Sequence, residues 1–263
     1  MANPNGTPIW FELTTGDQDK AQDFYRDVAG WTVSESPAPE HGGYRLANAP
    51  DGGGVAGIMK PPPGMDGLPG WVIYFASSDV DAMVEQVKQL GGAVHFGPMD
   101  IPHIGRFATV ADPQGVPFQI MKSSSPEDST AFKQVAHDRD GGFGHGVWIE
   151  LATPDPDGAL DFYGRLFGWE KKGSMPMGDM GDYIFIGTGE DFRPGAVMSS
   201  KTTGAPARWN WYVHVPNIDQ AVETTKAKGG TVLQEPMQIP GGDYSAKVGD
   251  AQGFQIGLVG SRK

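Results

Sequence analysis

The 263-residue chain has no cysteine, which excludes disulfide bonds and thiolate metal sites and leads us to expect a cytoplasmic protein. It has no apolar run near the length of a membrane span, and its opening MANPNGTPIW lacks the pattern of a secretory signal. Basic residues are few: 20 Lys and Arg stand against 32 Asp and Glu, a net charge of −12. This balance argues against nucleic acid and anionic membranes as partners.

What the sequence does have is an internal repeat. The segment WFELTTGDQDKAQDFYRDVAGW (10–31) returns as WIELATPDPDGALDFYGRLFGW (148–169), with 12 of 22 positions identical at an offset of 138. A repeat of this length indicates a duplicated structural unit. We therefore expect two similar halves.

Each repeated segment predicts a strand followed by a helix. Phe11 and Leu13 alternate with Trp10 and Glu12, the period of a strand with two different faces. An apolar stripe at helical spacing follows, with an aspartate before it to cap the helix and a glycine to end it. In the first copy these residues are Asp17, Ala21, Phe24, Tyr25, Val28 and Gly30.

A second strand–helix pattern follows inside each half, at 71–92 and 209–230. The turns Asp-Pro-Gln-Gly (112–115) and Asp-Ala-Gln-Gly (250–253) are typical of hairpins. The sequence thus predicts four βαβββ modules, at about 5–60, 68–122, 143–200 and 207–260. We expect domains at 1–122 and 143–263, joined by a polar linker at 123–142.

The motif ELxTxDxxxAxxFYxxxxGW, followed by DxQG and FQI, resembles the vicinal oxygen chelate superfamily. This superfamily includes glyoxalase I, extradiol dioxygenases and bleomycin-resistance proteins. The resemblance implies an α+β fold in which four βαβββ modules pair into two curled mixed-sheet glyoxalase-like domains. The helices would lie outside and a ligand would lie in the cup of each sheet.

The metal ligands that the resemblance implies are absent. By position, the family's two histidines and final glutamate correspond to Trp10, Val72 and Gln119, and in the second half to Trp148, Asn210 and Gln255. The ligand on the fourth strand falls near Ala56 or Gly57, and near Gly195 or Ala196 in the copy. None of these is a good ligand for a catalytic divalent ion. We predict no cofactor, and a metal is disfavoured.

Strand alternation predicts other residues in the cups. Glu12, Glu150, Tyr74 and Tyr212 are the candidate catalytic groups, because a carboxylate beside aromatic surface can act as a general acid or base. If the glutamates are structural instead, backbone amides or an arginine such as Arg45 or Arg208 would hold them. Ligand-binding candidates are Trp10, Gln119, His103 and Arg106 in the first half, and Trp148, Asn210, His214 and Gln255 in the second.

Three functions stay open at this point. The chain could be an enzyme (lyase, isomerase, hydrolase) using these glutamates and tyrosines on a small, partly aromatic or carbonyl-containing molecule. It could instead sequester such a molecule, as bleomycin-resistance proteins do. It could also be a metal-dependent glyoxalase or dioxygenase. We expect a monomer or homodimer whose two cups differ, since Arg106 suits an anionic ligand and His214 a neutral one.

Overall fold

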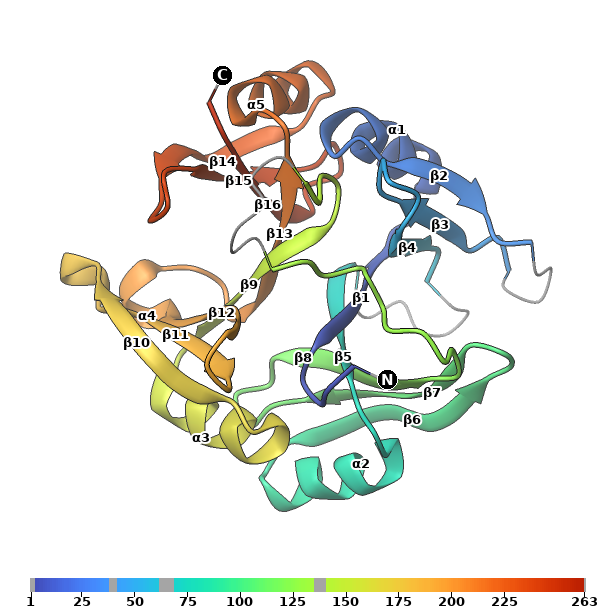
Figure 1. The fold of residues 1–263 in the computed structure, drawn as a ribbon, viewed down its shortest axis with the longest axis vertical. Coiled ribbons are helices and arrows are strands. Elements are labelled where there is room, and N and C mark those ends of the chain that lie inside the picture. The colour runs from blue at the N-terminus through green and yellow to red at the C-terminus, as the bar shows by residue number, and fades with distance from the viewer. Residues whose placement is uncertain (1–2, 38–41, 62–68, 135–140, 263) are drawn as a thin grey trace. The chain divides into compact units, whose positions relative to one another are not determined.

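The computed structural model describes residues 3–37, 42–61, 69–134 and 141–262 (Figure 1). Four βαβββ modules follow one another, as predicted. They are β1 (Pro8–Thr14), α1 (Gln18–Val28), β2 (Thr32–Glu35), β3 (Arg45–Asn48), β4 (Gly54–Met59); β5 (Gly70–Ala76), α2 (Val80–Gln89), β6 (Ala93–Ile101), β7 (Gly105–Ala111), β8 (Pro117–Ser123); β9 (Gly146–Thr153), α3 (Pro156–Phe167), β10 (Glu170–Pro176), η2 (Gly178–Met180), β11 (Asp182–Thr188), β12 (Phe192–Ser199), α4 (Ser200–Thr203); and β13 (Arg208–Val215), α5 (Ile218–Ala227), β14 (Thr231–Gln238), β15 (Tyr244–Gly249), β16 (Gln255–Gly260).

The long helices begin where a short polar side chain can replace the missing backbone partner. In α1, α2, α3 and α5 a capping oxygen accepts a hydrogen bond from the amide three residues on. The capping residues are Asp17, Asp79, Asp155 and Asn217. Gly168 ends α3 with a φ of 74°, a left-handed conformation that favours glycine. No helix among the described residues is long and apolar enough to cross a membrane.

The strands form two eight-stranded mixed sheets, one from each half of the chain. Their orders are β2-β3-β4-β1-β5-β8-β7-β6 and β10-β11-β12-β9-β13-β16-β15-β14. Within each module the first strand and the last strand run parallel, as in β1 with β4 and β13 with β16. The two orders match strand for strand, so the repeat in the sequence is also a repeat of topology.

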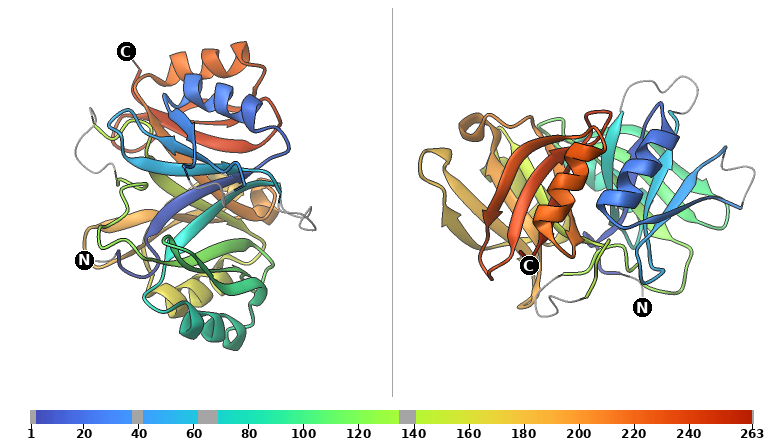
Figure 2. Two further views of the ribbon diagram at one scale, coloured as in Figure 1. Left: turned by 90° about the vertical axis from the view of Figure 1, so that its right-hand side faces the viewer. Right: turned by 90° about the horizontal axis from the view of Figure 1, so that it is seen from above.

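The chain also divides into two compact units, each drawing modules from both halves. Unit 1 comprises Met1–Ile9, Val72–Ser129 and Ile149–Asn210; unit 2 comprises Trp10–Trp71, Thr130–Trp148 and Trp211–Lys263. In unit 1, α2 contacts α3, and in unit 2, α1 contacts α5 (Figures 1 and 2). Each unit thus joins a helix from one half of the sequence to a helix from the other.

Aromatic side chains fill the core of unit 2. Phe11 stacks on Trp211 with ring centroids 3.8 Å apart, and Trp211 stacks on Trp31 at 6.0 Å. Tyr25 of α1 accepts a hydrogen bond from Trp71 Nε1 (2.9 Å) and donates one to Asp250 (3.0 Å). Phe11 therefore faces the helix side, which confirms the predicted faces of β1.

Unit 1 repeats this arrangement. Tyr163 of α3 accepts from Trp209 Nε1 (3.0 Å) and donates to Asp112 (3.1 Å). Burial, and then the neighbouring aspartate, raise the pKa of both Tyr25 and Tyr163 well above its usual value, so both hydroxyls keep their protons. Tyr25 and Tyr163, at 0% and 2% exposure, therefore serve core packing in both units.

The two aspartates also fix the predicted hairpin turns. The second oxygen of Asp112 accepts from the amides of Gln114 and Val116, both at 2.9 Å. Asp250 accepts from the amides of Gln252 and Phe254 in the same way. One carboxylate therefore shapes the turn and holds a tyrosine from the other half of the sequence.

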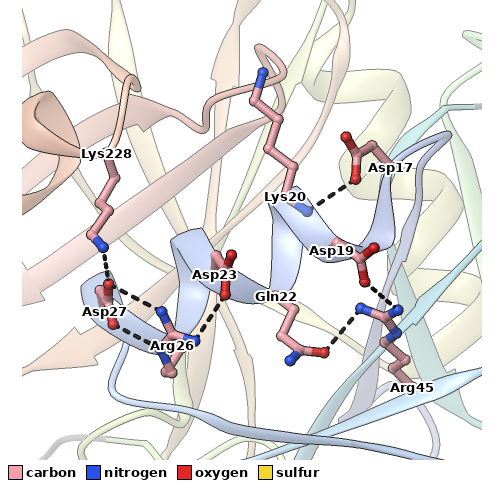
Figure 3. A network of polar contacts seen from close by, with 9 residues as sticks. All are labelled: Asp17, Asp19, Lys20, Gln22, Asp23, Arg26, Asp27, Arg45 and Lys228. Carbon is pink, nitrogen blue, oxygen red and sulfur yellow. Dashed lines mark hydrogen bonds and ion pairs between the residues drawn. The ribbon is translucent and has the colours of Figure 1, made fainter.

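The exposed side of α1 carries a network of charges (Figure 3). Arg45 of β3 pairs with Asp19 (2.5 Å) and donates to Gln22 (2.9 Å). Lys228, after α5, pairs with Asp27. The alternative in which Arg45 neutralises the buried Glu12 therefore finds no support, because Arg45 is used on the helix surface.

Part of the predicted linker is packed. Ala131 and Phe132 are buried, and Phe132 forms a β-bridge with Gly146. His145, fully buried, lies 2.9 Å from Asp51 and 2.7 Å from the carbonyl of Thr130. Residues 135–140 of the linker lie outside the described residues.

Candidate functional site

Glu12 is held by a tyrosine that the sequence did not single out. In unit 2, Trp10 Nε1 donates to the hydroxyl of Tyr44 (2.8 Å), and this hydroxyl donates to Glu12 Oε2 (3.0 Å). Burial, and then the Glu12 carboxylate, hold the pKa of Tyr44 well above its usual value. Tyr44 therefore stays protonated and orients a carboxylate that is 7% exposed.

Glu150 has an equivalent partner in unit 1. The hydroxyl of Tyr183 donates to Glu150 Oε2 at 3.0 Å, and Glu150 is 5% exposed. The register shows why sequence comparison missed this pair: Glu12 lies opposite Gly57, whereas Glu150 lies opposite Ala196. Glu12 and Glu150 are 138 positions apart, whereas Gly57 and Ala196 are 139 positions apart. The second half therefore contains one extra residue before β12. At an offset of 139, Tyr44 aligns with Tyr183.

Tyr74 and Gln119 lie in one row across strands β5, β8 and β7 of the first sheet, within unit 1. Tyr74 on β5 is paired with Gln119 on β8, which is paired with Thr109 on β7. Paired residues point to the same face of a sheet, so the three side chains share a face. Tyr74 also lies against Phe107, with ring centroids 6.3 Å apart. Two predicted site residues are thus neighbours.

The second half has a different residue in the middle of this row. In unit 2, Tyr212 is paired with Gly257, and Gly257 with Lys247. Gln255 is paired with Gly249, two positions earlier. The alignment of Gln255 with Gln119 is therefore wrong. The FQI motif is displaced because the second half has two fewer residues between turn and strand, and Gly257 is the true counterpart of Gln119.

The ring of Tyr212 fills the place left by the missing side chain. A Cβ atom on Gly257 would lie 2.1 Å from Cδ1 of Tyr212. Tyr212 is 4% exposed and packs with Val147 and Val259, and Trp148 lies against this cluster. Predicted residues Tyr212 and Trp148 are therefore brought together, in an apolar setting.

His214 and Asn210 are buried, at 1% and 5% exposure. In unit 2, Nδ1 of His214 lies 2.9 Å from the carbonyl of Gly141, and its ring lies 4.7 Å from that of Phe143. These contacts are those of a packed structural histidine. The predicted ligand roles of His214, Asn210 and Gln255 stay predictions.

His103 and Arg106 line a surface hollow of about 330 Å³ at the β6–β7 turn. His103 is exposed and has a φ of 64°, an uncommon conformation for a residue with a side chain. Arg106 donates two hydrogen bonds to Asp81 and one to Asp100. An anionic ligand would have to compete with these two carboxylates, so the predicted role of Arg106 requires displacement of an ion pair.

The positions that would hold a metal do not fit one. Trp10 is engaged with Tyr44, Val72 has no donor atom, and Gly57 has no side chain. A Cβ on Gly57 would lie 1.7 Å from the Tyr44 hydroxyl oxygen, so this tyrosine takes the space of a ligand there. Within the described ranges, no group of three His, Cys, Asp or Glu side chains could hold a metal ion.

Sequence comparison identifies the family. The profile of the Glyoxalase/Bleomycin resistance protein/Dioxygenase superfamily matches residues 8–120 and 145–258. The chain belongs to this superfamily. It is 33% identical over 250 residues to a Mycobacterium tuberculosis protein named "Putative glyoxylase CFP32", covering 94% of this chain and 92% of that protein. It is 31% identical over 256 residues to the anthracycline biosynthesis protein DnrV of Streptomyces peucetius, covering 90% and 87%.

Solved structures of the superfamily share the fold. The Mn(II)-bound glyoxalase from Novosphingobium aromaticivorans matches with a TM-score of 0.67 and 19% identity, covering 99% of this chain and 84% of the other. The 2,2',3-trihydroxybiphenyl 1,2-dioxygenase from Sphingomonas wittichii matches with a TM-score of 0.65 and 18% identity, covering 98% and 90%. At this identity the likeness concerns the fold alone. The α+β prediction and the family resemblance are confirmed.

Proposed function

We propose that this chain binds a small, partly aromatic or carbonyl-containing molecule, without a metal at the superfamily's usual positions. The candidate ligand contacts of the first half are Trp10 and Glu12 in unit 2, and Tyr74 and Gln119 in unit 1. Those of the second half are Trp148 and Tyr212 in unit 2, and Glu150 in unit 1. Aromatic surface with a few placed polar groups suits such a ligand.

One observation carries the proposal: each half buries a glutamate and orients it with a tyrosine hydroxyl. A buried, oriented carboxylate can accept a proton from a ligand hydroxyl or from a carbon beside a carbonyl group. Glu12 and Glu150 are therefore the proton acceptors of the proposed chemistry, and Tyr44 and Tyr183 are positioning residues. Such chemistry belongs to lyases and isomerases.

Sequestration without turnover is the second candidate. One relative is named a putative glyoxylase, which favours an enzyme, whereas the other is named only for anthracycline biosynthesis. The apolar packing of Tyr212 favours binding over catalysis in the second half. A metal-dependent glyoxalase or dioxygenase is the third candidate, and the poor fit of its ligand positions weighs against it.

The test is native mass spectrometry of protein purified without added ligand, combined with elemental analysis. We expect an organic molecule of a few hundred daltons and no stoichiometric transition metal. About one Zn, Ni, Fe or Mn per chain, lost together with activity on chelation, would contradict the metal-free proposal.

The captured molecule then separates the first two candidates. For an enzyme, Glu12→Gln combined with Glu150→Gln should abolish its conversion and leave its affinity nearly unchanged, because the amides keep the size of the carboxylates but cannot take the proton. Glu35→Gln is the matched control, since Glu35 is an exposed glutamate of β2. Binding without conversion by the wild type would identify a sequestering protein.

A further inference from the structure

We propose that the first half of the chain selects its ligand through the side-chain carbonyl of Gln119, which accepts a hydrogen bond from a neutral hydroxyl group on a flat aromatic molecule. The inference rests on the proposed function, because it names the ligand class for the same sheet face. It assigns to Gln119 a role that its counterpart Gly257 cannot have.

The starting observation is a carbonyl with no donor. Gln119 is 7% exposed, and its Oε1 atom is buried without a hydrogen-bond partner among the described residues. A buried polar atom left unpaired costs stability, and most buried polar groups are paired. A ligand donor that reaches this oxygen would remove the cost on binding. The atom is therefore suited to a ligand rather than to the fold.

The surroundings of Gln119 specify the ligand. Its row continues through Thr109 to Phe96 on β6, and Phe107 lies between Tyr74 and Phe96, with centroids 6.3 and 6.0 Å away. Three aromatic rings on one sheet face suit a flat apolar molecule. The row carries no charged side chain, so a neutral hydroxyl fits better than an ammonium group.

The face is distinct from the one that packs against α3. Phe75, Phe118 and Ile120 alternate with Tyr74 and Gln119 along β5 and β8, and each is fully buried. Phe75 and Phe118 contact one another at 5.9 Å, and both lie against Phe167 of α3, which places them on the helix side. Gln119 therefore points away from the helical core, where its carbonyl has no structural task in the described chain.

The second half lacks this acceptor. Gly257 has no side chain, and the ring of Tyr212 lies over it. The neighbour of Gly257 in the row is Lys247, where the first half has Thr109. The two halves therefore cannot recognise the same hydroxyl in the same way, and a hydroxyaromatic ligand should occupy the first half.

The experiment compares two probes that differ only in the donor. 2-Naphthol carries a neutral hydroxyl at pH 7, and 2-methoxynaphthalene has the same rings without it. Wild type should bind 2-naphthol about tenfold more tightly or better, and Gln119→Met should bind the two within about twofold. Gln238→Met, at an exposed glutamine of β14, is the control and should keep the wild-type discrimination.

A second readout needs no ligand. Gln119→Met and Gln119→Leu remove the unpaired carbonyl, so at least one of them should melt a few degrees above the wild type, while Gln238→Met should not. Lower melting temperatures for both Gln119 variants would overturn the inference.

The outcomes distinguish this inference from the proposed function. Equal affinity of the wild type for both probes, no affinity for either, or discrimination retained in Gln119→Met overturns the role of Gln119. The proposed function would still stand, since it requires only that some organic molecule be bound. Absence of any captured organic molecule, with 2-naphthol binding also missing, would overturn both.

Discussion

The two units agree in their cores and differ on the sheet faces that point away from the helices. The Trp–Tyr–Asp hydrogen bonds have nearly equal lengths in the two units. The bonds from Trp and to Asp are 2.9 and 3.0 Å long at Tyr25, and 3.0 and 3.1 Å long at Tyr163. The row containing Gln119 in unit 1 contains Gly257 in unit 2. Residues that hold the repeat together have been kept, while residues that can meet a ligand have diverged. The sequence repeat therefore indicates a shared architecture, but it does not indicate two equal binding sites.

The strongest test of the shared core removes the turn aspartates. Asp112→Ala and Asp250→Ala each delete a carboxylate that accepts from two amides and a buried tyrosine. We expect each to lower the free energy of unfolding by about 3 kcal/mol, because several buried donors lose their partner. Urea denaturation measures this. Losses that differ by more than about 2 kcal/mol between the two variants would break the equivalence of the cores.

The diverged faces can be tested through Gly257 and Tyr212. Gly257→Ala places a methyl group inside the Tyr212 ring and should destabilise by about 1–3 kcal/mol. In Tyr212→Ala the ring is gone, so adding Gly257→Ala should cost much less. The double-mutant cycle gives the coupling directly. Additive effects would show that Tyr212 does not occupy this space.

The two turn aspartates, Asp112 and Asp250, should make the stability of the protein depend on pH. Burial raises the pKa of Asp112 and Asp250 against the hydrogen bonds that lower it. A carboxyl whose pKa is higher when folded keeps its proton longer in the native state. Its contribution to stability is therefore fully present below its usual pKa of 3.8 and is lost as the pH rises through the folded pKa.

The expected result is a pH-dependent difference between variants. Asp112→Asn and Asp250→Asn cannot titrate, so their stability relative to the wild type should be better at about pH 7 than at about pH 4. Urea denaturation at the two pH values checks the sign. If a variant differed from the wild type by the same free energy of unfolding at both pH values, the raised pKa would be contradicted.

The smallest effects are expected at the surface hollow. Arg106 pairs with the exposed Asp81 and Asp100, so Arg106→Ala should leave the free energy of unfolding almost unchanged. For binding we predict that the two halves are unequal: a given ligand should bind one at least about tenfold more tightly, and Arg106→Ala and His214→Ala should affect different sites. Calorimetry finding two identical sites, both unmoved by either change, would defeat this.

The sequence predicted what depends on period and local chemistry. The alternation in β1 assigned Phe11 and Glu12 to opposite faces, and the turn residues located both hairpins. The comparison of the two halves failed where the second half had gained or lost one or two residues relative to the first. The extra residue before β12 hid the equivalence of Tyr44 and Tyr183, and the shortened turn misaligned Gln255 with Gln119. The pairing of Tyr25 with Asp250 leaves no trace in local patterns, because it is a contact across 225 positions.

The separation of Tyr25 and Asp250 in the sequence determines when their contact can form during synthesis. The tyrosine–aspartate contact of unit 1 spans 51 positions, so it can form while synthesis continues. The contact of unit 2 cannot form until residue 250 has left the ribosome, and the contact of Thr15 with Gln252 must also wait. Contacts across such distances form slowly, and apolar surface left uncovered meanwhile promotes aggregation. The first helix to be synthesised is therefore among the last to be buried, and the nascent chain carries its aromatic face uncovered for most of translation.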